Sequence, residues 1–236
     1  MAADLKGRVA LVTGANRGIG FAVCRRLGQE GMTVILASRD QERGEQAAGS
    51  LRAEGLDVAA RQLDVTDQTS VDAAAAWLQA TYGRLDVLAN NAGIMPNKDS
   101  VLEATLEDAE AMWQVNALAP WRVCRALVPL MLRGGWGRIV NVSSEAGRFD
   151  RINAVATAYR VSKAALNAYT KSLAAELHSK GVLVNAVYPG WVASDMGGPE
   201  ASRSLKQGAE SIFWAIALDD DGPTGGFFQD GKPLSW

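Results

Sequence analysis

Tyr159 and Lys163 stand four positions apart in an apolar-periodic run, 157–180, that predicts a helix. Residues at this spacing share one helix face, so the lysine ammonium is expected beside the tyrosine phenol. A free phenol has a pKa of about 10, and a nearby cation lowers such a pKa by ~1–3 units. The pair is therefore a candidate acid/base group, although a tyrosine and a lysine at this spacing are often mere neighbours.

Two further polar residues have sequence contexts that favour a site. Ser144 follows an expected strand, 138–142, and ligands of open α/β sheets bind beyond the carboxyl ends of strands. It is placed to donate to a substrate oxygen, or to form a turn, as serines at strand ends commonly do. Asn116 lies in an expected helix, 105–132, and a buried amide there needs hydrogen-bond partners. Pro120 should kink that helix, or sit where its missing backbone bond is tolerated.

A glycine-rich turn joins the expected strand 8–12 to a helix that ends near residue 29. Its residues are Thr13, Gly14, Ala15, Asn16, Arg17, Gly18, Ile19 and Gly20. Such a turn lets the backbone approach a pyrophosphate at the helix N-terminus. The strand–turn–helix context favours a dinucleotide loop over a plain tight turn.

The end of the next expected strand, 33–38, carries the signal for the kind of dinucleotide. Ser38 stands about where an NAD-binding domain places a carboxylate against the ribose 2′-hydroxyl. Without that carboxylate a 2′-phosphate is not repelled, and Arg39 offers it a fork of donors. Arg17 is a second candidate for the same phosphate. NADP(H) is therefore the predicted cofactor, while the alternative is two solvated arginines.

Two other strand ends are expected to line the same crevice. Asp64 and Val65 end the strand that begins at residue 58, and Asp64 either accepts from an adenine amino group or caps the next helix. Asn90, Asn91, Ala92 and Gly93 follow the strand 85–89, where small and amide residues leave room for a cofactor or form an Asn-rich turn.

Regular alternation of strands and helices predicts the fold class. A chain of 236 residues fits one large α/β domain or two small ones, and no linker interrupts it. We expect one doubly wound Rossmann-type domain over residues 1–236, with about seven parallel strands and helices on both faces. The segment 191–207 lacks periodicity and exceeds the usual loop length, so residues 194–207 are a candidate substrate lid.

Composition excludes several classes of function. The formal charge of −2 argues against a nucleic-acid-binding surface, and no apolar run approaches the ~20 residues that span a bilayer. A single histidine, His178, and two separated cysteines make a Ser-His-Asp triad or a metal centre improbable. Cys24 and Cys124 both lie in apolar helical patterns, as thiols of a cytoplasmic protein would. The N-terminus shows no signal-peptide pattern.

Together these residues resemble the short-chain dehydrogenase/reductase family across nearly the whole chain. The order and spacing of its motifs are matched by Thr13-Gly14-x-x-x-Gly18-x-Gly20, Asn90-Asn91-Ala92-Gly93, Asn116, Ser144, Tyr159-x-x-x-Lys163 and Pro189-Gly190. Within the family the chain looks most like NADPH-dependent carbonyl reductases. That narrower likeness lies in residues 14–20, in Pro189-Gly190-Trp191-Val192 with Asp195-Met196, and in the tail from Asp221 to Trp236.

The resemblance implies a role for each catalytic candidate. Tyr159 would protonate the substrate oxygen, Lys163 would lower the pKa of Tyr159 and hold the nicotinamide ribose, and Ser144 would orient the substrate. Asn116 would hold a water that links Lys163 to solvent. The stretch from Asn91 to Gly93, together with Pro189, Gly190 and Val192, would frame the cofactor. Met95, Glu145, Phe149, Trp191 and Met196 flank the proposed site and are candidate substrate-pocket walls.

One departure from the family concerns assembly. Monomeric animal carbonyl reductases carry a long insertion between the serine and the tyrosine, which covers a helix face that other members use for dimerisation. Only fourteen residues separate Ser144 from Tyr159 here. A homodimer or homotetramer through the helices that contain Asn116 and Tyr159 is therefore the expectation.

The leading hypothesis is NADPH-dependent reduction of an aldehyde, ketone or quinone. Alternatives within enzymes are alcohol oxidation and reduction of a 3-oxoacyl group bound to a carrier. A non-catalytic NADP(H)-sensing regulator is the alternative outside enzymes, although such a protein would be expected to lose one of the four catalytic candidates. A wall of Met and Trp would suit a bulky apolar carbonyl compound.

Overall fold

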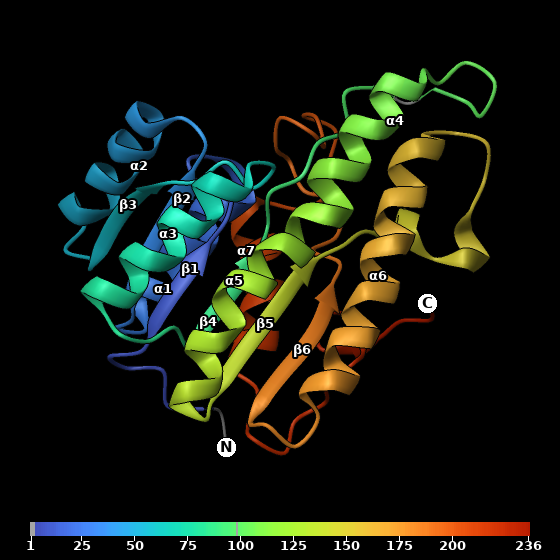
Figure 1. Ribbon diagram of the computed structural model, residues 1–236. Coiled ribbons are helices and arrows are strands. Elements are labelled where there is room, and N and C mark those ends of the chain that lie inside the picture. The colour runs from blue at the N-terminus through green and yellow to red at the C-terminus, as the bar shows by residue number, and fades with distance from the viewer. Residues whose placement is uncertain (1–2, 98) are drawn as a thin grey trace.

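The computed structural model describes residues 3–97 and 99–236, and within them one eight-stranded sheet runs through the molecule (Figure 1). Its strand order is β3-β2-β1-β4-β5-β6-β7-β8. The first seven strands are parallel, and β8 pairs antiparallel with β7. The strands are β1 (Val9–Val12), β2 (Thr33–Ser38), β3 (Val58–Gln62), β4 (Val87–Asn90), β5 (Gly137–Val142), β6 (Val182–Val187), β7 (Phe227–Gln229) and β8 (Lys232–Pro233).

The central strands form because their sequences are short apolar runs, as buried parallel strands require. All residues of β1, β4, β5 and β6 are buried. The predicted doubly wound sheet with about seven parallel strands is confirmed. The two-residue β8 was not predicted, since two residues carry no periodicity.

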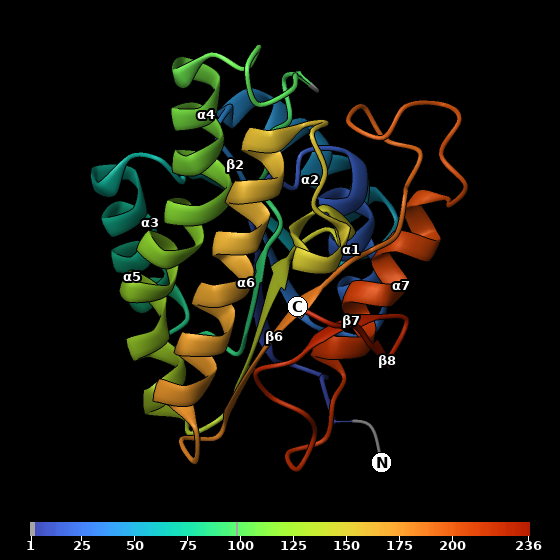
Figure 2. The same cartoon turned by 90° about the vertical axis from the view of Figure 1, so that its right-hand side faces the viewer.

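Helices cover both faces of the sheet (Figure 2). One layer holds α1 (Gly18–Gln29), α2 (Gln41–Ala53) and α7 (Leu205–Ile216), and the other holds α3 (Gln68–Thr81), α4 (Leu106–Trp113), α5 (Ala119–Gly134) and α6 (Thr157–Leu177). Neighbouring residues of one strand serve different layers: Val12 packs with α1, α2 and α7, whereas Leu11 packs with α3, α5 and α6. The sheet thus separates two hydrophobic cores, one on each of its faces.

The strand order reverses between β1 and β4, where Leu11 pairs with Leu88. From β1 the chain first proceeds outward to β2 and β3, and then returns to β4 on the other side. The two connections leave a crevice beyond the carboxyl ends of β1 and β4, which is where ligands of such sheets bind.

The expected helix 105–132 is three elements in the structure. Thr105 caps α4, a π-helical turn, η1, follows at Gln114–Leu118, and α5 then begins at Ala119. Pro120 lies in the first turn of α5, directly after the π turn, so its missing N–H falls where the hydrogen-bond pattern changes from one helix type to the other. The turn η1 carries Asn116, and π turns often occur at functional sites.

The expected lid, 194–207, overlaps the start of α7. Ser204 caps that helix and forms a capping box with Gln207, so residues 205–207 are helical. The irregular part therefore ends at Ser204.

Candidate active site

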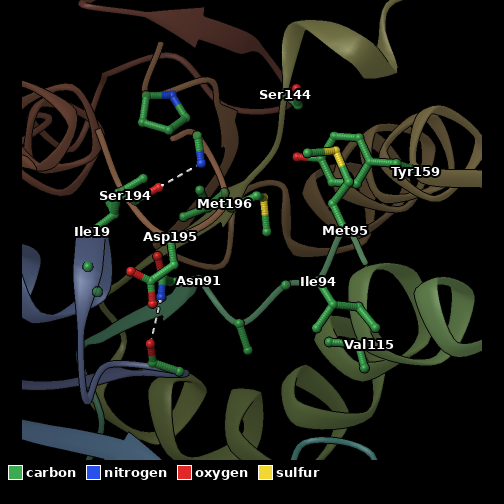
Figure 3. Close-up of a pocket in the computed structure, with 18 of the residues that line it drawn as sticks. Ile19, Asn91, Ile94, Met95, Val115, Ser144, Tyr159, Ser194, Asp195 and Met196 are labelled. Carbon is green, nitrogen blue, oxygen red and sulfur yellow. Dashed lines mark hydrogen bonds between the residues drawn. The ribbon is translucent and has the colours of Figure 1, made fainter. Parts of the chain in front are cut away.

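A cavity of about 840 Å³ opens beyond the carboxyl ends of β1, β4 and β5 (Figure 3). Most residues predicted for the site line it. These are Gly14, Asn16, Arg17, Gly18, Ile19, Gly20, Ser38, Arg39, Asp64, Val65, Asn91, Ala92, Gly93, Met95, Ser144, Glu145, Tyr159, Lys163, Pro189, Gly190, Trp191, Val192 and Met196. Asn116 and Phe149 are not among the lining residues.

Asn91, which follows β4, fixes the glycine turn that follows β1. The two groups of residues lie where the strand order of the sheet reverses. The Asn91 side-chain amide donates to the carbonyl oxygens of Thr13 (2.9 Å) and Gly14 (3.2 Å). The Thr13 hydroxyl in turn accepts from the backbone N–H groups of Asn91 and Ala92, both at 3.0 Å. The two segments that follow β1 and β4 are thus held together by side chains.

This contact leaves space only for glycine at two positions. A Cβ on Gly14, which has φ +62°, would lie 2.9 Å from the Ala92 Cα, and a Cβ on Gly20 would lie 2.5 Å from the Asn91 amide nitrogen. Gly18 also has positive φ, but no heavy atom lies within 4 Å of its Cβ position. The turn therefore presents bare backbone to open space at the N-terminus of α1, a cradle that fits a pyrophosphate.

The far end of the cavity carries charged side chains of both signs, Arg39 and Arg43 beside Asp40 and Asp64. Ser38 is buried at the end of β2, and the exposed Arg39 and Arg43 follow it on the rim. Arg43, in the first turn of α2, was missed from the sequence. Its guanidinium lies 3.4 Å from Asp40.

Asp64 lines the same end, and its carboxylate accepts from the N–H (2.9 Å) and the hydroxyl (2.6 Å) of Thr66. Partial burial opposes ionisation, but these bonds and the charge of Arg39 outweigh it and lower the pKa of Asp64. The cap of α3 is Asp67. The helix-capping alternative for Asp64 is therefore wrong, and its contact with adenine stays a prediction.

Tyr159, in the first turn of α6, is 9% exposed. Burial raises its pKa to about 12, the Ser144 hydroxyl acts in the opposite direction, and the Tyr188 phenol raises it further. The prediction that Lys163 lowers this pKa in the folded chain is therefore wrong: burial sets the direction of the shift, and Lys163 is not among its causes. Ser144 is held by its place as the residue before a short 3-10 turn, where its hydroxyl accepts from the Ala146 N–H at 3.1 Å.

Lys163 is 4% exposed and donates to the Val142 carbonyl oxygen at 2.9 Å. Its ammonium lies 5.7 Å from the centroid of the Tyr159 ring, so the predicted neighbourhood of the two side chains is present. Burial lowers the pKa of Lys163 to about 8. With a pKa so close to neutral pH, the protonation of Lys163 is sensitive to any charged or polar group that approaches it.

Asn116 is fully buried behind the cavity wall. Its carbonyl oxygen accepts from the Ile94 N–H at 2.8 Å, while its amide group donates to the Ile94 carbonyl (2.9 Å) and the Ser162 hydroxyl (3.0 Å). Both amide hydrogens are therefore used, and a water could bind only through the second lone pair of the carbonyl oxygen. A Cβ on Gly93 would lie 3.3 Å from that oxygen and 3.5 Å from the Lys163 Nζ.

The other wall of the cavity is largely apolar. Met95, Trp191 and Met196 line it as predicted, together with Glu145. Phe149 does not line it, because its segment turns outward and leaves the ring 74% exposed; its proposed place in the wall was wrong. The lining residues that sequence reasoning missed on this side include Ile94, Val115, Arg151, Asn153 and Tyr188.

Residues 8–204 match the model of the family described as short chain dehydrogenase. The chain belongs to this family. This short-chain dehydrogenase is 36% identical to carbonyl reductase [NADPH] 1 of Mus musculus, over 97% of this chain and 98% of that one. It is 34% identical to (+)-neomenthol dehydrogenase of Arabidopsis thaliana, over 94% and 96% of the two chains.

Solved structures give the same result. The NADPH-bound carbonyl reductase from chicken fatty liver superposes with a TM-score of 0.88 at 28% identity, covering 98% of this chain and all of that one. These findings confirm the predicted family and its likeness to carbonyl reductases, and they bear out the predictions of an oxidoreductase and of NADP(H) as its cofactor.

Proposed function

We propose that this chain reduces a carbonyl group of a small molecule with NADPH, and that Tyr159 donates the proton. The observation that supports this most is the placement of Tyr159, together with Ser144 and Lys163, on the wall of the cavity that also contains the glycine turn. One cavity can thus receive a dinucleotide at one end and a substrate at the other.

The protein's own residues would divide the work as follows. NADPH supplies a hydride to the carbonyl carbon. Tyr159 stays protonated at neutral pH because its pKa lies near 12, and so it has a proton to give. The Ser144 hydroxyl lines the same cavity and would donate to the oxygen on which charge develops.

Lys163 would contribute a positive charge beside Tyr159. At neutral pH its pKa of about 8 still leaves most of it protonated. The charge favours the phenolate that remains after the proton leaves. Asn116 would keep this arrangement in place, since it bonds to both backbone groups of Ile94 and to Ser162, whose hydroxyl donates to the Tyr159 carbonyl at 2.8 Å.

The preference for NADPH would come from Arg39, Arg43 and Arg17, which line the cavity. Arginine forks suit a phosphate, and Ser38 at the end of β2 brings no charge that would repel it. The apolar wall made by Met95, Trp191 and Met196 supports a bulky apolar carbonyl compound as the substrate.

The test is cofactor oxidation by purified protein with NADPH and with NADH. The panel holds aromatic aldehydes, diketones, quinones, cyclic ketones and a carrier-bound 3-oxoacyl thioester, with the alcohols and NADP⁺ for the reverse direction. Tyr159→Phe should abolish turnover and leave NADPH binding within twofold, whereas Tyr82→Phe, a tyrosine outside the cavity, should change neither. NADPH binding without turnover on any compound would point to a sensing regulator instead.

We also propose that two copies pair through α4, α5 and α6. Leu106, Trp121 and Val161 on these helices are 88%, 53% and 52% exposed. The alignment with the mouse reductase runs over 276 positions, 40 more than this chain has residues, which agrees with a missing cover. The double variant Trp121→Glu, Val161→Glu should be a monomer where the wild type is a dimer or tetramer. Light scattering measures the molar mass of both proteins. A monomeric wild type would reject the proposal.

A cytoplasmic location is proposed as well. Cys24 and Cys124 are both buried free thiols, as a reducing compartment allows. Within the described residues no helix has the length and apolar character needed to cross a membrane. Fractionation of cells that produce the tagged protein would test the location.

A further inference from the structure

Residues 193–202, here called the flap, form a loop on one side of the cavity mouth. The residues just before and after this loop, at its base, are paired with each other. Val192 pairs with Arg203 across the base: the Ala193 N–H donates to the Arg203 carbonyl at 2.8 Å, and the Arg203 N–H donates to the Trp191 carbonyl at 3.0 Å. The two ends of the flap are thus joined by backbone bonds.

The base is anchored to the body of the protein. The Arg203 guanidinium forms two bonds with the Asp230 carboxylate, at 2.6 and 2.7 Å, beyond β7. Its side chain also fills the space beside Gly190, where a Cβ would lie 2.2 Å from the Arg203 Cδ. Any movement of the flap must therefore occur within residues 193–202, while the paired residues at its two ends stay in place.

The flap is also held together internally. The Trp191 indole donates to the Gly197 carbonyl at 2.8 Å, and the Gly197 N–H donates to the Ser194 hydroxyl at 3.2 Å. In the described part of the chain, one hydrogen bond or ion pair ties this unit to the opposite wall of the cavity. It joins Asp195 to Arg17 of the glycine turn, at 2.5 Å.

Asp195 and Arg17 both line the cavity, and Figure 3 draws Asp195 on the side of the glycine turn marked by Ile19. Their side chains are 70% and 68% exposed, so water screens the pair and it can exchange partners easily. A phosphate that approaches Arg17 competes with the carboxylate for this guanidinium, and meets its negative charge while doing so.

We propose that Asp195 is a specificity-determining residue of the cofactor site. Its pairing with Arg17 bridges the cavity mouth, and the 2′-phosphate of NADPH takes over the arginine when the dinucleotide binds. This inference rests on the proposed use of NADPH. It predicts that Asp195 makes NADPH binding weaker than the arginines alone would allow, and that NADH, which lacks this phosphate, is affected far less.

The test is the dissociation constant of each dinucleotide, measured by calorimetry without substrate. Asp195→Asn keeps the shape of the side chain and removes its charge. We expect it to tighten NADPH binding about three- to fivefold at low salt and to leave NADH within twofold. The gain should shrink at 0.5 M salt. Glu200→Gln removes the same charge from an exposed flap position outside the cavity lining and should change neither constant.

A double-mutant cycle locates the effect. In an Arg17→Met background, Asp195→Asn should no longer tighten NADPH, because the competition needs the arginine. If Asp195→Asn leaves NADPH binding unchanged, or alters both dinucleotides equally, the inference is wrong. If the wild type shows no preference for NADPH, the proposed function itself is at fault, so the two failures are told apart by the wild-type constants.

Discussion

The Lys163 ammonium is buried and donates to the Val142 carbonyl oxygen, and burial lowers its pKa to about 8. The unfolded chain, with a lysine pKa near 10.5, binds this proton more tightly than the folded protein does between these two values. Stability from this group is therefore lowest below pH 8 and rises with pH toward 10.5.

Replacing Lys163 with methionine should stabilise the cofactor-free protein at pH 7. Removing the buried charge outweighs the Val142 carbonyl that is left unpaired, and we expect a gain of about 2 kcal/mol in the free energy of unfolding. Urea titrations at pH 7 and pH 10 should show the gain shrinking at the higher pH. Lys180→Met, at an exposed position, serves as the control. A less stable Lys163→Met at pH 7 would refute this reading.

Turnover should follow the charge on Lys163. The kcat/KM for NADPH reports groups of the free enzyme, so it is expected to fall as pH rises above about 8, where Lys163 loses its proton. Tyr159 does not cause this fall, because its pKa is about 12. Phenolate absorbance compared between wild type and Tyr159→Phe checks the assignment. A phenolate signal from Tyr159 at pH 8 in the cofactor-free protein would contradict it.

Asn116→Leu should destabilise the protein by ~3 kcal/mol, because it leaves both backbone groups of Ile94 without their partner inside the protein. For a chain of this size that corresponds to a fall in melting temperature of roughly 6–12 °C. Activity should fall as well, since the segment after β4 that contains Gly93 loses its support. Differential scanning calorimetry measures the first effect. A melting temperature within 2 °C of the wild type would show that Asn116 does not hold this segment.

Gly20→Ala should weaken NADPH binding at least tenfold, since the new Cβ would lie 2.5 Å from the Asn91 amide nitrogen and push apart the two segments of the crevice. Gly134→Ala is the matched control. It lies near the end of α5 with no heavy atom within 4 Å of its Cβ position, and should stabilise the protein by ~0.5–1 kcal/mol without affecting binding. Equal dinucleotide affinity in Gly20→Ala and wild type would count against the cradle.

Much of the site could be predicted because its signals are local. The glycine turn and Tyr159 with Lys163 each occupy a few consecutive residues, and the end of β2 lies at a fixed distance from the turn. Asn116 was singled out from its apolar surroundings, but its partner Ile94 lies 22 residues earlier, and no local pattern points to that bond.

Other features depend on tertiary context. The direction of the Tyr159 pKa is a balance between burial and neighbours, and burial is known only from the folded chain. Phe149 was placed in the pocket by its closeness in sequence to Ser144, whereas two 3-10 turns, 145–147 and 149–151, lead its ring away. The ion pair of Asp195 with Arg17 joins residues 178 positions apart, which spacing rules do not reach.

The π turn at Gln114–Leu118 holds one residue more than an α-helix would need to cover the same rise. Deleting one residue between Trp113 and Ala119 would let α4 and α5 join as one regular helix. The helix faces of α4 and α5 would be kept, because the deleted residue is the one that the wider turn accommodates. What would change is the turn itself, which carries Asn116 and its bonds to both backbone groups of Ile94. The support of this segment thus depends on one additional residue in the chain, as well as on the amide of Asn116.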